Sequence, residues 1–264
     1  MQITSSSIFI TFIISGICVL VFNTFLKNKK NYHLFRIDFL TMLAILTFLR
    51  LLLPVEFIFT ITIESPTIMN PIQTLFLKPI YKNMLFNQFL LLTWIVVAIL
   101  LFVHYIFVLC KLNKNTEKII SISQRLEDIN CKYPVYQTNF VNVPTIFATK
   151  KTIFLPKLDY SSQELNDILV HETQHINNHD LQIKQLINIL SIIYWWNPFV
   201  YVYKNQMQLL LEMRVDSKVT DTLTTQQSLL YTQSLVSIQK KIFSKNPRKI
   251  DSYPQILSMK MKMY

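Results

Sequence analysis

The chain has 264 residues, of which 51% are hydrophobic and only 16% are charged. Soluble globular proteins carry about 25% charged residues, so this composition excludes a disordered protein and disfavours a purely soluble enzyme. The single glycine, Gly16, excludes the glycine-rich loops that bind phosphates and dinucleotides. The net charge of +11 fits either nucleic acid or the cytoplasmic face of a membrane, and its distribution along the chain decides between them.

Three apolar stretches within residues 1–112 are each long enough to cross a bilayer. They lie at about 8–26, 39–62 and 89–110. The first has no positive start and no small-residue cleavage site, so we expect a retained span rather than a signal peptide. Arg50 interrupts the second stretch. It either snorkels near a span end at Pro54 or contacts another helix or a substrate.

The basic residues predict the orientation of these spans. The segment 27–36 holds four basic residues and no acid, and Lys111, Lys114 and Lys118 follow the third span. The positive-inside rule therefore places both regions in the cytoplasm and the N-terminus outside. The tail at 237–264 is also basic, and anionic lipid headgroups explain it better than nucleic acid. We expect a multi-pass protein of the cytoplasmic membrane.

Residues 113–236 are expected to form a cytoplasmic α+β domain. The apolar spacing within 115–132 predicts that the third span continues there as a helix. Val135–Val143 is strand-like, and 144–156 predicts a small β-hairpin with a polar turn.

A helix with a metal-binding pattern follows the hairpin. Ser161 and Glu164 fit a capping box at its start. His171 and His175 are four residues apart, so they project from one face as two nitrogen ligands of one zinc ion can. Glu172 can then take the proton of a zinc-bound water that attacks a peptide carbonyl. The alternative is a surface helix that happens to hold two histidines.

A third ligand is needed, and Glu212 is the candidate. It interrupts an apolar run, where an unpaired buried carboxylate is costly and metal ligation offsets that cost. Asp216 lies one turn further along and can hydrogen-bond a ligating histidine. The alternative is an ordinary salt bridge from Glu212 to Arg214 or Lys218.

The segment between the histidines and Glu212 constrains the topology. His179 is expected at the surface or at a helix end. Asp180 is expected to cap the next helix through its side-chain oxygen. A direct metal role is not expected for it, because nine residues after His171 it faces about the opposite side of a helix. The segment 181–203 is nearly long enough to span, with a break at Asn197-Pro198. If this segment crossed the membrane, Glu212 and the histidines would lie on opposite sides of it. We therefore expect a helix pair packed on the core or against the membrane face.

Three motifs in this order resemble the BlaR/MecR family of membrane metallopeptidases. They are HETQHINNHD at 171–180, YWWNPFVYVY at 194–203 and EMRVD at 212–216. Also similar to the family are RLLLP at 50–54, PTIF at 144–147 and IFLP at 153–156. The resemblance implies a cytoplasm-facing gluzincin protease domain beside membrane helices. It also implies His171, His175 and Glu212 as zinc ligands and Glu172 as the catalytic glutamate.

The best-known members of that family detect β-lactams with an extracellular penicillin-binding domain. Their activated protease leads to loss of a cytoplasmic winged-helix repressor from its operator. This sequence runs to Tyr264 after the basic tail, with no fourth span and no sensor domain expected. We therefore expect no direct acylation by β-lactams. Ala148 also stands where the family's hairpin tends to have glycine.

The sequence as a whole predicts a mostly α membrane protein with three N-terminal transmembrane helices and a cytoplasmic zinc metalloendopeptidase domain. We expect it to cleave a repressor-like cytoplasmic protein, or itself, during signalling. The hairpin edge at Thr145, Ile146 and Phe147 is expected to bind the extended substrate. The expected partners are Zn²⁺, the bilayer, a polypeptide and a second copy in a homodimer, without direct nucleic-acid binding. Two alternatives remain: a peptide- or pheromone-processing membrane protease, and a non-catalytic truncated adaptor.

Overall fold

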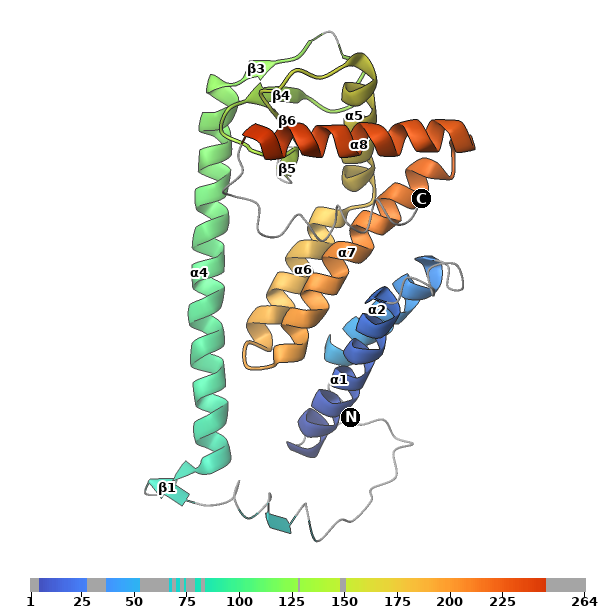
Figure 1. The fold of residues 1–264 in the computed structure, drawn as a ribbon. Helices are drawn as coiled ribbons and strands as arrows, with labels where there is room; N and C mark the ends of the chain where they lie inside the picture. The colour runs from blue at the N-terminus through green and yellow to red at the C-terminus, as the bar shows by residue number, and fades with distance from the viewer. Residues whose placement is uncertain are drawn as a thin grey trace.

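The computed structural model describes residues 5–27, 37–52, 67, 70–71, 74, 79–81, 84–127, 129–147 and 151–245. This part of the chain is mostly helical, with a small mixed sheet at one end (Figure 1). The helices are α1 (Ser5–Lys27), α2 (Ile37–Leu52), α4 (Phe86–Ile122), α5 (Ser162–Asn177), α6 (Asp180–Ile193), α7 (Pro198–Thr220) and α8 (Thr225–Lys245). The strands are β1 (Pro79–Tyr81), β2 (Met84–Leu85), β3 (Gln124–Arg125), β4 (Val135–Thr138), β5 (Thr145–Phe147) and β6 (Thr152–Pro156).

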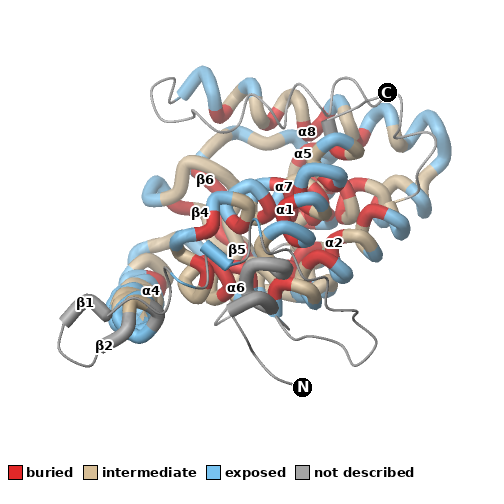
Figure 2. The backbone as a smooth tube through the Cα atoms, turned by 90° about the horizontal axis from the view of Figure 1, so that it is seen from below, coloured by how far each residue is buried: buried red, intermediate tan, exposed pale blue. Residues whose placement is uncertain are grey.

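Among the described residues, one helix is long and apolar enough to cross a membrane. It is α4, whose candidate stretch is Gln88–Ile122 and includes the third predicted span. This helix stands at the side of the molecule and is largely exposed (Figures 1 and 2). Helix α1 contains a shorter apolar stretch, Phe12–Leu26, and α2 ends at Leu52. The rest of the second predicted span, 53–62, lies outside the described residues. The structure thus supports one candidate span where the sequence predicted three.

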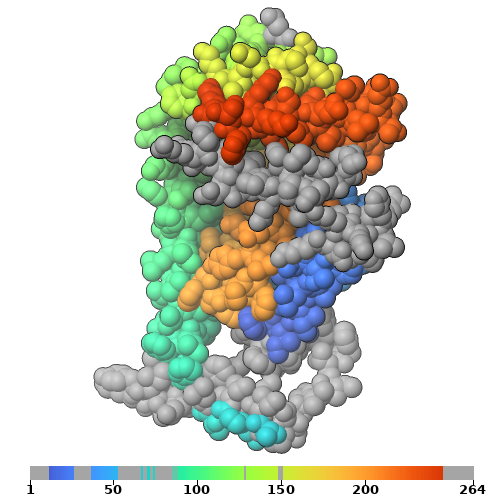
Figure 3. Space-filling model, in the orientation of Figure 1, coloured from blue at the N-terminus to red at the C-terminus, as the bar shows by residue number. Residues whose placement is uncertain are grey.

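Helices α6 and α7 form a hairpin between α4 and the α1–α2 pair (Figures 1 and 3). Asn197 caps α7 by accepting a hydrogen bond from the Phe199 N–H at 2.9 Å, and Pro198 occupies the first helical position. The hairpin packs on α1 and α2 through one apolar core. This core includes Val19, Phe22, Leu26, Leu40, Ala44, Leu51, Ile187, Leu190, Val200, Tyr203, Met207 and Leu210. The segment 181–203 therefore packs on a core, which is one of the two arrangements predicted for it.

The sheet has the strand order β3-β4-β6-β5, in which β4 and β6 are parallel and the other pairs are antiparallel. The predicted hairpin is confirmed as β5 and β6. All five residues of β6 are buried, and its apolar side chains pack with those of α5 and α8. Strand β5 lies at the edge of the sheet.

The helix predicted over 115–132 is wrong in its second half. Helix α4 ends at Ile122, and Gln124 and Arg125 pair with β4 as an edge strand. Leu126 and Ile129, whose spacing suggested a helix, instead pack against the core under the sheet. Apolar residues at these positions suit either structure, and the available strand partner decides between them.

Candidate metal centre

Helix α5 begins at the predicted capping box and carries the histidine pair. The Ser161 hydroxyl accepts a hydrogen bond from the Glu164 N–H at 3.2 Å, and the Glu164 carboxylate accepts one from the Ser161 N–H at 2.8 Å. Ten and fourteen residues from this cap, His171 and His175 lie on one face and are both buried. Their Nε2 atoms are 3.3 Å apart.

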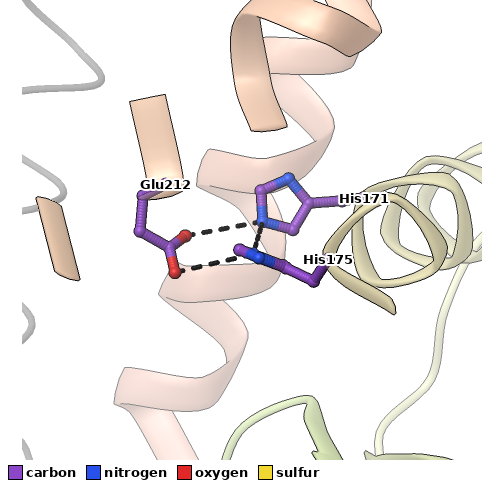
Figure 4. A group of neighbouring side chains, drawn as sticks. All are labelled: His171, His175 and Glu212. Atoms are coloured by element: carbon purple, nitrogen blue, oxygen red, sulfur yellow. Dashed lines mark hydrogen bonds and ion pairs between the residues drawn. The ribbon is translucent and has the colours of Figure 1, made fainter. Parts of the chain in front are cut away.

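Glu212 reaches this pair from α7. Its Oε2 lies 3.5 Å from His171 Nε2, and its Oε1 lies 3.5 Å from His175 Nε2 (Figure 4). Atoms that ligate a tetrahedral zinc at about 2.0–2.2 Å lie roughly 3.3–3.6 Å from one another. The spacing of the three side chains fits such an ion. Glu212 therefore contacts the histidines, as predicted. The two residues of the alternative salt bridge have other partners: Arg214 pairs with Asp180, and Lys218 donates to Asn178.

Asp180 orients His175, and this contact was not predicted from the sequence. Its Oδ2 accepts a hydrogen bond from His175 Nδ1 at 2.7 Å, so the Nε2 lone pair is directed at the metal position. The predicted capping role of Asp180 is wrong, because His179 is the N-cap of α6 and makes no side-chain capping bond. His179 has φ 59° and ψ 31°, and this left-handed residue breaks the helix between α5 and α6. The break turns Asp180 back toward His175, which a continuous helix would not do.

His171 is held at its Nδ1 by groups from two helices. Asp216 Oδ1 lies 3.2 Å away on α7, in the position expected of it. The hydroxyl of Tyr231 on α8 lies 2.8 Å away. Tyr231 could not be predicted from the sequence, since no fixed spacing links α8 to the histidine motif.

Glu172 lines the same cavity as the three candidate ligands. Burial raises the pKa of its carboxyl, although the neighbouring imidazoles act to lower it. Burial also opposes ionisation of Glu212, but hydrogen bonds from both histidines hold the pKa of that carboxyl well below its ordinary value. Desolvation acts to lower the pKa of His175, and hydrogen bonds to Asp180 and Glu212 outweigh it and raise the pKa to about 9. The pKa values of the two carboxyl groups are therefore shifted in opposite directions.

The cavity in front of this cluster has a volume of about 680 Å³. One wall is the segment Val143–Ile146, which enters β5, and the opposite wall is the second half of α8. Thr145 and Ile146 of the predicted substrate edge line the cavity. Phe147 is not among the lining residues, and it packs edge-on against Phe154 with ring centroids 5.0 Å apart.

The model of the BlaR1 peptidase M56 family matches residues 1–252. The chain belongs to this family. M56 peptidases are metallopeptidases, and His171, His175 and Glu212 form a cluster that could hold a metal ion. The resemblance drawn from the sequence motifs is confirmed.

Curated relatives of this M56 peptidase match a smaller part of it. The methicillin resistance mecR1 proteins of Staphylococcus aureus and Staphylococcus epidermidis are 29% identical over 104 residues, covering 38% of the chain. The regulatory protein BlaR1 of Bacillus licheniformis is 30% identical over 89 residues, covering 33%. These alignments span 18% and 15% of the relatives' own lengths. The chain therefore matches less than a fifth of the length of these relatives, and what is shown for it is membership of the M56 peptidase family.

Proposed function

We propose that this M56 peptidase is a zinc endopeptidase that cleaves an extended polypeptide in the cavity between β5 and α8. The observation that carries the proposal is the ligand geometry. Three side chains from two helices place two nitrogens and a carboxylate at the mutual spacing of a tetrahedral zinc site, with Glu172 beside them. A structural zinc site needs no such glutamate and no open cavity in front of it.

The residues of the chain have distinct parts in this reaction. An extended substrate segment pairs with the open edge of β5, so its backbone runs along the cavity wall at Thr145 and Ile146. A bound zinc supplies a polarised water and a Lewis acid for the scissile carbonyl. Glu172 accepts the proton of the attacking water and delivers it to the leaving amine.

The proposed substrate is a cytoplasmic, repressor-like protein, or the chain itself. Two of the relatives are named for methicillin resistance and one as a regulatory protein, which supports a signalling role. The basic residues at 27–36 and after the third predicted span support a cytoplasmic catalytic side. We further propose that α1, α2 and α4 contact the bilayer, as their exposed apolar side chains suggest.

The test compares cells that express the chain with cells that express Glu172→Gln, by mass-spectrometric profiling of new protein N-termini. Glu172→Gln keeps the three ligands and removes the base, so we expect it to bind zinc and to lose cleavage. Glu127→Gln is the matched control, because Glu127 is exposed and lies outside the residues that line the cavity. If new N-termini persist in Glu172→Gln, the protease proposal fails. Cleavage confined to secreted peptides would favour a peptide-processing role over a signalling one.

A further inference from the structure

Helix α8 contributes a buried tyrosine to the metal centre from outside the two helices that hold the ligands. Tyr231 is 2% exposed and packs with Val215, Val219 and Leu235 in a small apolar cluster. The hydroxyl of a buried tyrosine usually has a hydrogen-bond partner, and here it has two that belong to the centre.

One hydrogen-bond arrangement satisfies all three polar groups at this point. The Tyr231 hydroxyl donates to Asp216 Oδ1 at 3.2 Å, because an ionised carboxylate only accepts. The hydroxyl oxygen then accepts from His171 Nδ1–H at 2.8 Å, with Asp216 Oδ1 3.2 Å from the same nitrogen. This assigns the proton of His171 to Nδ1 and leaves the Nε2 lone pair facing His175 and Glu212.

The same helix forms a second wall of the cavity, in addition to the wall at β5. Beginning one turn after Tyr231, the side chains of Leu235, Ile238, Gln239 and Ile242 line it. Helix α8 is fixed on α5 by polar contacts further along. Ser237 donates to Glu164 at 2.7 Å, and Lys241 pairs with Glu164 at 2.6 Å.

We propose that Tyr231 is a positioning residue of the metal centre, which fixes the tautomer and orientation of the His171 imidazole and aligns the α8 wall of the cavity with the metal. The proposal rests on the proposed zinc site. The two histidines are held differently. His175 depends on Asp180 of α6, whereas His171 depends on a tyrosine–carboxylate pair from α7 and α8. Loss of the Tyr231 hydroxyl therefore weakens one ligand and leaves the other in place.

The test measures zinc affinity of the full chain in detergent by competition with a chromophoric chelator. For Tyr231→Phe we expect zinc to bind 10- to 100-fold more weakly, the range found when groups behind metal ligands are removed. The visible spectrum of the Co²⁺ form should also change, because the His171 imidazole is free to rotate. Neither measurement depends on a substrate or on catalysis.

Two controls separate positioning from packing. Tyr160→Phe removes a hydroxyl that donates to the Pro156 carbonyl at 3.0 Å, away from the metal. Val219→Ala makes a small cavity in the same apolar cluster as Tyr231 without removing a polar contact. We expect both to bind zinc within twofold of the parent chain. Equal zinc affinity and an equal Co²⁺ spectrum for Tyr231→Phe and the parent chain would overturn the proposal.

Zinc affinities also show whether the proposed zinc site or only the role of Tyr231 is wrong. If the parent chain and His171→Ala bind zinc equally, then the three side chains are not the metal site and both proposals fail. If the parent chain binds zinc tightly, His171→Ala does not, and Tyr231→Phe matches the parent, only the positioning role is wrong. A Val219→Ala affinity that falls as far as that of Tyr231→Phe also rejects the positioning role, since packing alone then accounts for the loss.

Discussion

Asp180 Oδ2 and His175 Nδ1 are 2.7 Å apart, although the two residues belong to different helices. The contact exists because His179 adopts a left-handed conformation, which breaks the helix between α5 and α6. Asp180 is fully buried and also pairs with Arg214 of α7. One carboxylate thus joins α5, α6 and α7 at the metal centre.

Asp180→Asn is expected to weaken zinc binding 10- to 100-fold. The amide oxygen can still accept from His175 Nδ1–H, but it lacks the negative charge that increases the basicity of the imidazole. It also leaves Arg214 without its charged partner, so the chain should unfold at a lower temperature. Zinc affinity by chelator competition and thermal unfolding of the full chain check both effects. The control is Asp221→Asn, an exposed carboxylate at the end of α7. Unchanged zinc affinity in Asp180→Asn would show that the contact does not tune the ligand.

The histidine motif and the glutamate helix could be read from the sequence because their geometry is local. His171 and His175 share a face by helical periodicity alone, and Glu212 stood out as a carboxylate within an apolar run. Asp216 could be found in the same way, one helical turn after Glu212, but two other residues behind the candidate ligands could not. Asp180 depends on one backbone residue with positive φ, and Tyr231 depends on how α8 crosses α5 and α7. Such contacts are set by tertiary packing, which no spacing rule encodes.

The same distinction applies to the fold. The hairpin of β5 and β6 and the capped start of α5 rest on local signals, and both are present. Strand β4 pairs in parallel with β6, although β5 lies between them in the sequence. This order of strands was not predicted. The short strand β3 replaced the predicted helix because β4 offered it a partner.

Glu164→Gln is expected to loosen α8 from α5 in a pH-dependent way. Desolvation acts to raise the pKa of Glu164, but hydrogen bonds from Lys241, the Ser161 N–H and Ser237 outweigh it and lower the pKa to about 2. A carboxyl with a depressed folded-state pKa adds stability above its ordinary pKa of 4.5, and this contribution is lost as the pH falls toward 2. Hydrogen bonds to a charged group contribute about 1.5–3 kcal/mol, so Glu164→Gln should lower the free energy of unfolding by this amount at pH 7.

Chemical unfolding of the full chain between pH 7 and pH 2 checks this prediction. The gap between the parent chain and Glu164→Gln should stay constant down to about pH 5 and close as the pH approaches 2. Asp159→Asn is the control, because that carboxylate is exposed in the loop before α5. A gap that does not change with pH would mean that packing, and not ionisation, holds the two helices together.

Gly16→Ala is expected to disturb the contact between α1 and α7. A Cβ at Gly16 would lie 2.9 Å from the ring of Phe199, closer than real side chains approach. Overpacking of this kind costs about 1–3 kcal/mol. We expect a lower unfolding temperature for Gly16→Ala, measured on the detergent-solubilised chain. The double variant with Phe199→Leu should recover part of the loss, because leucine has no ring at that point. Additive losses in the double variant would contradict a direct contact.

The three tryptophans of the chain all lie near the tip of the α6–α7 hairpin, and they can report its depth in a bilayer. Trp195 and Trp196 lie in the turn between the helices, and Trp94 Nε1 donates to the Ile193 carbonyl at 2.6 Å. Helix α6 has 14 residues, so it extends about 21 Å from the metal centre to this tip. If α4 spans the bilayer, the hydrogen bond from Trp94 places the hairpin tip within the depth of that span.

We therefore expect lipids brominated in the acyl chains to quench the fluorescence of the chain in vesicles. In Trp94→Phe, which retains only Trp195 and Trp196, the quenching should persist, since these residues lie at the same depth as Trp94. The variant with both Trp195→Phe and Trp196→Phe leaves Trp94 as the internal reference on α4. If the brominated lipids quench Trp94 while Trp195 and Trp196 respond only to a water-soluble quencher, the hairpin lies outside the bilayer and packs on α1 and α2 alone. Equal quenching of both variants would show that the hairpin enters the membrane beside α4, with the metal centre held at the opposite end of α6.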